Sequence, residues 1–295
     1  MSVEEVTIAS ADIRAGISSL GAELVRLQDG NGTDYLWSGD PAWWNGRSPI
    51  LFPIVGEVKS GKLQVDGKIF AMARHGFARQ SVFEVILREP AHCALRLRPN
   101  EETRAQYPFE FELRLDYEVV GRTLSIRASV SNAGAGVMPA SLGFHPAFRW
   151  PLAPDLPRTA HAITFDRPEV APVERPVDGL LSGSPRPSPV DGRRLALDDS
   201  LFEEGAIIFD KLESRHVVYG AATGPRIVVA FDRMPHLGIW SKPGAGFVCV
   251  EPWQGYASPP DFEGELRDKP GIVSIAPGAT RQFEIRIGIE PGNGT

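Results

Sequence analysis

The chain has 295 residues, enough for one large domain or two of ordinary size, so length alone leaves the number of domains open. An apolar fraction of 42% and a charged fraction of 23% exclude disordered, collagen-like and disulfide-rich proteins. The formal net charge of −6 argues against a nucleic-acid or anionic-membrane partner and favours a small polar ligand.

The first residues, MSVEEVTIAS, contain no basic stretch leading into an apolar run, so no secretory signal is predicted. No apolar run approaches the ~20 residues that a membrane-spanning helix needs. Cys93 and Cys249 lie in runs of β-type residues, which favours buried free thiols over a disulfide. These features predict a cytoplasmic protein.

Most of the chain has the pattern of short strands separated by Gly- and Pro-containing turns. In chain order the predicted strands are 81–89, 92–99, 109–120, 123–133, 161–166, 215–221, 226–232, 247–253 and 281–290. Helical patterns of ten or more residues are nearly absent and strands do not alternate with helices, which argues against doubly wound folds. The sequence therefore predicts an all-β fold.

Two segments refine this prediction. Residues 109–120 alternate apolar and charged side chains, as expected for an antiparallel sheet with one face in water. Residues 150–200 are rich in Pro and Asp with weak periodicity, which suits either a linker between domains or a long excursion from one domain. Because β character resumes on both sides without a change in composition, we expect an excursion and a single domain over residues 1–295.

His145 lies in the apolar run ASLGFHPAFRWPL, residues 140–152. Pro146 fixes the backbone after it, and apolar surroundings lower the pKa of an imidazole unless a carboxylate is close. Such a histidine can take part in proton transfer. Considered alone, a core histidine bonded to a backbone carbonyl is the favoured interpretation.

Glu251 follows an apolar strand in GFVCVEPWQG, residues 246–255. Burying a carboxylate at the end of a strand costs free energy unless the group forms an ion pair or takes part in catalysis. Burial also raises its pKa towards the range of a general base. A salt bridge with an arginine is an equally good interpretation of this residue taken alone.

An aromatic segment precedes Arg47 and contains Trp37, Trp43 and Trp44. Tryptophan faces can stack on sugar rings and arginine can bind hydroxyls or phosphate, but a core aromatic cluster would have the same sequence.

His75 lies between Arg74 and Arg79, two cations that keep an imidazole neutral at pH 7. It can then bind a polar ligand or anchor a loop. Metal-binding motifs, a Gly-rich phosphate loop and a GxSxG elbow are absent, so neither a metal nor a cofactor is predicted.

Seven motifs together resemble the aldose 1-epimerase, or galactose mutarotase-like, family, and in particular its bacterial branch. They are GAEL (21–24), DYLWSGDPAWW (34–44), RSPILFPIVG (47–56), HGFAR (75–79), YPFEFEL (107–113), LGFHPAF (142–148) and VCVEPWQG (248–255). The resemblance implies a β-supersandwich fold and mutarotation, the interconversion of the α and β anomers of a sugar or sugar phosphate. It implies no cofactor.

The resemblance also implies roles for individual residues. Glu251 matches the general base that acts on the C1 hydroxyl, and His145 matches the general acid that protonates the ring oxygen. His75 and Arg47 match positions that hold the ring oxygen and hydroxyls, and Arg79 is placed to bind the ligand. Ring opening needs an ionised Glu251 and a protonated His145, so we expect the carboxylate to raise the imidazole pKa, within an apolar collar of Phe144 and Phe148.

One position departs from the family pattern. Members commonly carry a sugar-binding aspartate before an Ala-hydrophobic-hydrophobic-Phe run, whereas Gly205 precedes AIIF here. Asp210 or Glu204 could replace that acid. A non-catalytic carbohydrate-binding protein on the same scaffold is therefore the alternative to a mutarotase, and a carbohydrate lyase or hydrolase is a third hypothesis. The sequence leaves the sugar and the oligomeric state open.

Overall fold

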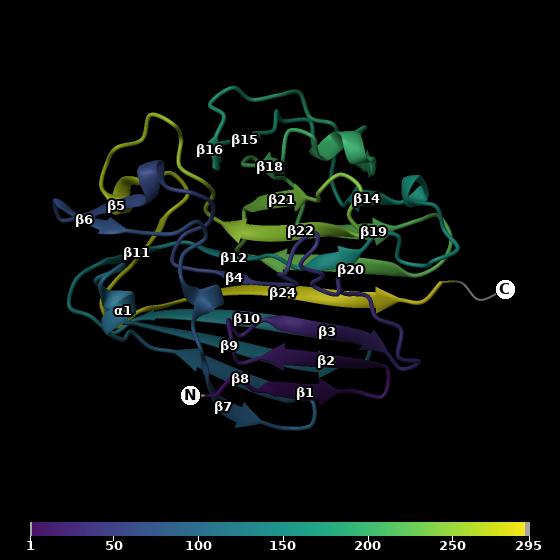
Figure 1. Cartoon of the computed structure of the whole chain (residues 1–295), viewed down its shortest axis with the longest axis horizontal. Coiled ribbons are helices and arrows are strands. Elements are labelled where there is room, and N and C mark those ends of the chain that lie inside the picture. Colours follow the sequence, from purple (N-terminus) through teal and green to yellow (C-terminus); the bar gives the residue numbers. More distant parts are fainter. Residues whose placement is uncertain (1, 293–295) are drawn as a thin grey trace.

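The computed structural model describes residues 2–292, and these residues form an almost entirely β structure (Figure 1). The only α-helix among them is the four-residue α1 (Glu101–Arg104). Short 3₁₀ turns are η1 (Lys59–Gly61), η2 (Ala78–Gln80), η3 (Arg158–Ala160), η4 (Asp199–Phe202) and η5 (Leu266–Asp268). The predicted all-β fold is confirmed. Within the described residues no helix is long and apolar enough to cross a membrane.

The largest sheet has nine antiparallel strands. In spatial order they are β17 (Arg194–Ala196), β14 (Ala162–Phe165), β19 (His216–Gly220), β20 (Arg226–Asp232), β24 (Thr280–Glu290), β10 (Thr123–Asn132), β9 (Phe111–Val120), β8 (His92–Leu97) and β7 (Glu84–Arg88). Strand β24, the last in the chain, occupies the centre of this sheet, between β20 and β10 (Figure 1).

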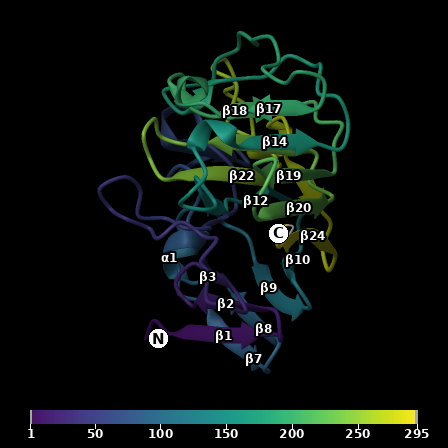
Figure 2. The ribbon, with the colours of Figure 1, turned by 90° about the vertical axis from the view of Figure 1, so that its right-hand side faces the viewer.

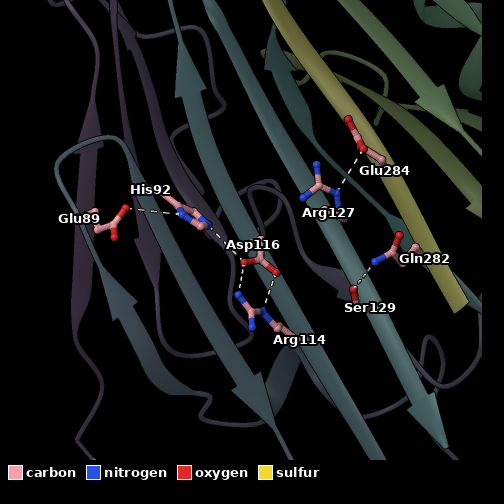
Figure 3. A network of polar contacts seen from close by, with 8 residues as sticks. All are labelled: Glu89, His92, Arg114, Asp116, Arg127, Ser129, Gln282 and Glu284. Carbon is pink, nitrogen blue, oxygen red and sulfur yellow. Dashed lines mark hydrogen bonds and ion pairs between the residues drawn. The ribbon is translucent and has the colours of Figure 1, made fainter. Parts of the chain in front are cut away.

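One face of this sheet is buried and the other carries charged side chains, as the alternation in residues 109–120 predicted. Along β9, buried residues alternate with residues that reach water. Figure 3 shows the polar face, where Asp116 Oδ1 lies 2.6 Å from Arg114 Nη2 and 3.2 Å from His92 Nε2. On the neighbouring strands Arg127 pairs with Glu284 at 3.4 Å. Alternation thus selects which side of the sheet faces the core.

A second sheet supplies the strands that position the candidate site. It contains β18 (Ile207–Phe209), β21 (His236–Trp240), β22 (Phe247–Gln254), β12 (Leu142–Phe144) and β4 (Ile50–Leu51), and β13 (Ala147–Arg149) also pairs with β22. All eight residues of β22 are buried. Side chains of both sheets share one hydrophobic cluster that extends from Val6 to Ile289.

The remaining strands form smaller units. They are the three-stranded sheet β1 (Glu5–Ala9), β2 (Ile13–Ser18) and β3 (Leu24–Asp29), and the pairs β5 (Lys62–Val65) with β6 (Lys68–Ala71), β11 (Met138–Ala140) with β23 (Val273–Ile275), and β15 (Pro176–Val177) with β16 (Leu180–Leu181). Figure 2 shows β1–β3 and β7–β9 at one end of the molecule and β14, β17 and β18 at the other.

The segment 150–200 is built into the fold. Its strands β14 and β17 extend the nine-stranded sheet, and β15 and β16 form a hairpin next to the candidate site. Both cysteines are free and buried, as expected from their positions in apolar runs.

Candidate active site

His145 and Glu251 are brought together by the pairing of β22. Strands β12 and β13 both pair with β22, and His145 and Pro146 form the break between them. The carbonyl of Pro146 still accepts the N–H of Val250 at 3.1 Å, so the break stays beside β22. His145 Nε2 therefore lies 3.1 Å from Glu251 Oε2. The two residues meet because a proline interrupts the strand opposite the glutamate.

The pair is almost completely buried, with 7% of His145 and 1% of Glu251 exposed. Burial raises the pKa of Glu251 well above its usual range, and the indole of Trp253 opposes this in part. Burial lowers the pKa of His145 to about 3. The expectation that the imidazole pKa would be raised is wrong for this structure, because desolvation is the largest influence on it and lowers it. Both shifts favour the uncharged forms, a carboxylic acid at Glu251 and a neutral imidazole at His145.

Aromatic rings enclose His145. The ring centroid of Trp44 lies 4.9 Å from that of His145, and the centroid of Trp240 lies 5.8 Å away on another side. Phe144 and Phe148, predicted to form the apolar collar, point into the hydrophobic core. Side chains alternate between the two sides of an extended segment. Because His145 faces the cavity, Phe144, which directly precedes it, faces the opposite side.

A cavity of about 460 Å³ opens in front of the pair, and we name it the His145 cavity. Its lining residues include Trp44, His75, Arg79, His145, Trp240, Glu251 and Trp253. Trp253 fits because glycines flank it on both neighbouring strands. A Cβ atom at Gly143 or Gly238 would lie 2.6 Å or 2.4 Å from the indole. The size of the cavity suits a small ligand such as a monosaccharide.

His75 faces the same cavity from a tight turn in which its own φ is +66°. Its Nδ1 accepts the N–H of Gly56 at 3.0 Å, which leaves Nε2 to carry the proton of the neutral ring. Burial lowers the pKa of His75 well below its usual value, and the charges of His145, Arg79 and Arg74 add to this. As expected, His75 is neutral, but desolvation is the main cause.

Two arginines form the cationic side of the His145 cavity. Arg79 donates from Nη2 to the carbonyl of Arg74 at 2.8 Å, and its buried Nε has no hydrogen-bond partner among the described residues. Arg74 Nε lies 3.0 Å from Glu57 Oε2. Burial, and next the charge of Arg74, lower the pKa of Arg79. An anionic group on a ligand would offset the positive charge of the two arginines and accept hydrogen bonds from them.

Arg47 and Asp210, both predicted to bind substrate, do not line the His145 cavity. Arg47 donates from Nε to the carbonyl of Ser38 at 2.8 Å, and its backbone N–H donates to Glu23 at 2.7 Å. Asp210 follows β18 and lies near Tyr256, whose pKa is raised by burial and by the charge of Asp210. Arg47 is turned towards its own loop, and Asp210 lies beyond the stretch of β18 that reaches the cavity.

Gly205 itself lines the cavity, with φ at +81°. A Cβ atom there would lie 2.8 Å from the Cγ of Pro176 in the β15–β16 hairpin. The hairpin therefore fills the space that a side chain at residue 205 would need. Glu204 points to the surface, where it pairs with Arg186 at 3.5 Å. Neither Glu204 nor Asp210 replaces an acid at this position in the cavity.

Cys249 lies close to the pair. Its Sγ, a nitrogen of His145 and an oxygen of Glu251 are all within 4.8 Å of one another, a spacing that could hold a metal ion. The thiol is fully buried, and burial raises its pKa well above the usual value. Metal ligation requires the thiolate, which this environment disfavours.

Several lining residues were not predicted as part of a site. Trp240 and Ile208 come from β21 and β18, and Pro176 and Gly179 come from the β15–β16 hairpin. The Asp178-Gly179 dipeptide is a turn signal that predicts a hairpin, but no local pattern shows which surface a hairpin covers.

Comparisons with known proteins agree with this fold. The family profile described as aldose 1-epimerase matches residues 4–272. The protein LacX, chromosomal, of Lactococcus lactis subsp. lactis is 32% identical over 282 residues, covering 91% of this chain and 94% of the relative. The chain therefore belongs to the aldose 1-epimerase family.

Solved structures show the same architecture. A galactose mutarotase related enzyme from Lactobacillus acidophilus superposes with a TM-score of 0.92 at 30% identity, covering 98% of both chains. A galactose mutarotase-like protein from Lactobacillus casei gives a TM-score of 0.91 at 28% identity, covering 97% of this chain and all of the other. The predicted galactose mutarotase-like supersandwich is confirmed.

Proposed function

We propose that the protein is a mutarotase that interconverts the α and β anomers of an aldose or hexose phosphate. The observation that carries this proposal is the buried contact of 3.1 Å between His145 Nε2 and Glu251 Oε2 at the His145 cavity. The pair can accept a proton and donate one at neighbouring positions, which is what opening a hemiacetal ring requires.

Ring opening uses the form of the pair with an ionised Glu251 and a protonated His145. Glu251 takes the proton of the C1 hydroxyl, the bond between C1 and the ring oxygen breaks, and His145 gives its proton to that oxygen. The pair is then a neutral acid and a neutral imidazole, the form that burial favours. After rotation of the aldehyde, the reverse transfers close the ring on the other face and restore the starting form.

Exchange between anomers, measured by two-dimensional NMR with glucose, galactose and glucose 6-phosphate, tests the proposal. Glu251→Gln removes the proton acceptor and is expected to slow exchange by about 10²- to 10⁴-fold. Glu284→Gln makes the same chemical change on the polar face of the nine-stranded sheet and should leave exchange unchanged. Unaltered exchange in the folded Glu251→Gln variant would rule out this mechanism, and sugar binding without any exchange would favour a carbohydrate-binding protein.

Within this function we propose a phosphorylated sugar as the preferred substrate. Arg74 and Arg79 both line the His145 cavity, Glu57 is the carboxylate that pairs with Arg74, and Arg79 Nε is unpartnered among the residues that the structure describes. A phosphate group would pair with this excess positive charge through charge-assisted hydrogen bonds.

Arg79→Gln tests the preference for phosphate. We expect the ratio of kcat/KM for glucose 6-phosphate to that for glucose to fall about tenfold or more, because a charged hydrogen bond is lost from one substrate only. Arg98→Gln, on the outer face of the nine-stranded sheet where Arg98 pairs with Glu112 at 2.9 Å, is the matched control. Equal losses on both sugars would show that Arg79 does not recognise phosphate.

A further inference from the structure

A second cavity lies between the β5–β6 hairpin and the loop that follows β22. Figure 1 shows this loop beside β5 and β6. It measures about 210 Å³, and Val58, Leu63 and Phe262 contribute apolar walls. Lys269 also lines it, and we name it the Lys269 cavity. A space of this size admits only a small molecule.

Neighbouring residues of the same two segments line the two cavities. Gly56 and Ala257 line the His145 cavity, and Val58 and Ser258 line the Lys269 cavity. The two segments are joined where the Ser258 N–H donates to the carbonyl of Glu57 at 2.9 Å. They are closely packed, since a Cβ atom on Gly56 would lie 2.5 Å from Ala257.

Lys269 carries a buried amine that has no carboxylate partner among the described residues. Only 3% of the residue is exposed, and its ammonium donates to the carbonyl of Tyr256 and lies 5.7 Å from the centre of that ring. Burial lowers the pKa of its amine to about 7, with no carboxylate in the described part of the chain close enough to oppose the shift. An ammonium has three donors, and a buried charge of this kind is costly unless it is paired.

The other charged groups around the Lys269 cavity leave it positive. Lys59 pairs with Glu263 at 2.5 Å at the rim, and Lys62 adds a further positive charge. His236 faces Lys269 from β21, and the charge of Lys269, after burial, contributes to holding the pKa of His236 at about 4. His236 is therefore neutral near pH 7, so it neither pairs with the ammonium nor adds a second positive charge beside it.

We propose that the Lys269 cavity binds a small carboxylate with an apolar body, with Lys269 as the counter-ion. The apolar walls fit the body of such a ligand, and a single negative charge costs less to desolvate than a doubly charged phosphate. The carboxylate of the ligand forms an ion pair with Lys269 that no described residue provides. This site is distinct from the proposed mutarotase site, and its occupancy is measured directly.

The test is calorimetric titration of the full chain with benzoate, and with benzamide as the uncharged analogue of the same shape. We expect benzoate to bind at least tenfold more tightly than benzamide. Pairing must protonate Lys269, so titrations in buffers of different ionisation heat should show uptake of close to one proton per site at about pH 8 and much less at about pH 6. This measurement uses the unaltered protein, so it does not depend on a variant folding.

Lys269→Met should abolish benzoate binding, and Lys68→Met, which makes the same change at an exposed residue outside the cavity, should leave it intact. The proposal is overturned by the absence of saturable benzoate binding, by equal binding of benzamide, or by binding without proton uptake at about pH 8. Anomer exchange can be retained or absent in each case, so failure of the site and failure of the proposed mutarotase function are separate results.

Discussion

At the scale of single residues, Gly205 departs from the family pattern in two ways. It carries no acidic group, and it leaves no space for a side chain beside Pro176. The residue has a left-handed backbone and faces Pro176, so a side chain there meets two obstacles at once. Gly278 also has positive φ, at +72°, but a Cβ atom there would have nothing within 4 Å. Comparing alanine substitutions at the two glycines therefore distinguishes backbone strain from steric exclusion by the hairpin.

Gly278→Ala is expected to lower the free energy of unfolding by about 1 kcal/mol through backbone strain alone. Gly205→Ala should cost about 1–3 kcal/mol more because its Cβ also meets Pro176. Urea unfolding measures both, and Pro176→Ala in the Gly205→Ala background should recover part of the difference. Equal costs at the two positions would mean that the hairpin moves aside freely.

The sequence predicted the character of His145 and Glu251 but not their contact by any local rule. Each lies in an apolar run, which predicts burial, and only the pairing of β22 with the break at Pro146 brings them within 3.1 Å. Arg47 illustrates the opposite case. Its place in a motif suggested a ligand, but its side-chain direction is set by a hydrogen bond to Ser38 that the motif does not reveal.

At the scale of elements, the strands on both sides of β22 carry glycines where they pack against Trp253. Gly238 on β21 lies against the indole, and a Cβ atom added to this glycine would come within 2.4 Å of the ring. Gly288 on β24 has ordinary space, because the atoms nearest to an added Cβ would be 3.8 Å away. Both glycines are within strands, so a change to alanine affects the backbone of each in a similar way.

Gly238→Ala should destabilise the protein by about 1–3 kcal/mol and displace Trp253 from the wall of the His145 cavity. Gly288→Ala should be neutral or stabilising by up to about 1 kcal/mol. Unfolding monitored by tryptophan fluorescence reports stability and the surroundings of the tryptophans, including Trp253, in one experiment. A Gly238→Ala variant as stable as the parent would show that the indole has room to shift.

Long strands were predictable and short ones were not. Strands such as β9 and β10 alternate over ten residues each, which is enough to define a period. Strands β4, β12 and β13 have two or three residues, too few for any pattern, and they exist because β22 or its neighbours supply hydrogen-bond partners. Apart from β22, which was predicted as 247–253, the strands nearest the candidate site were thus the ones that local sequence could not define.

At the scale of the whole molecule, buried histidines link stability to pH. Burial lowers the pKa of His236 to about 4, and the charges of Lys269 and Arg215 contribute. The His236 imidazole takes up a proton near pH 6.5 in the unfolded chain but only near pH 4 in the folded protein. Stability is therefore lost as the pH falls through this interval.

The contribution of His236 to this loss is expected to approach about 3 kcal/mol between pH 6.5 and pH 4. His236→Asn keeps an acceptor for the N–H of Gly255 and removes the titrating group, so its unfolding free energy should fall less steeply with acidification. Parallel urea-unfolding series for the two proteins isolate the effect, and identical slopes would assign the acid sensitivity to other groups.

The central position of β24 has a consequence for the order in which the chain can fold. Strands β7 to β10 come early in the sequence and β14, β17, β19 and β20 come later, and the last strand alone joins these two halves of the nine-stranded sheet. During synthesis the halves have no shared backbone hydrogen bonds until β24 has left the ribosome, so each exposes an unpaired edge to other chains. A chain that ends before β24, even with His145 and Glu251 both present, lacks the strand that joins the two halves of the nine-stranded sheet.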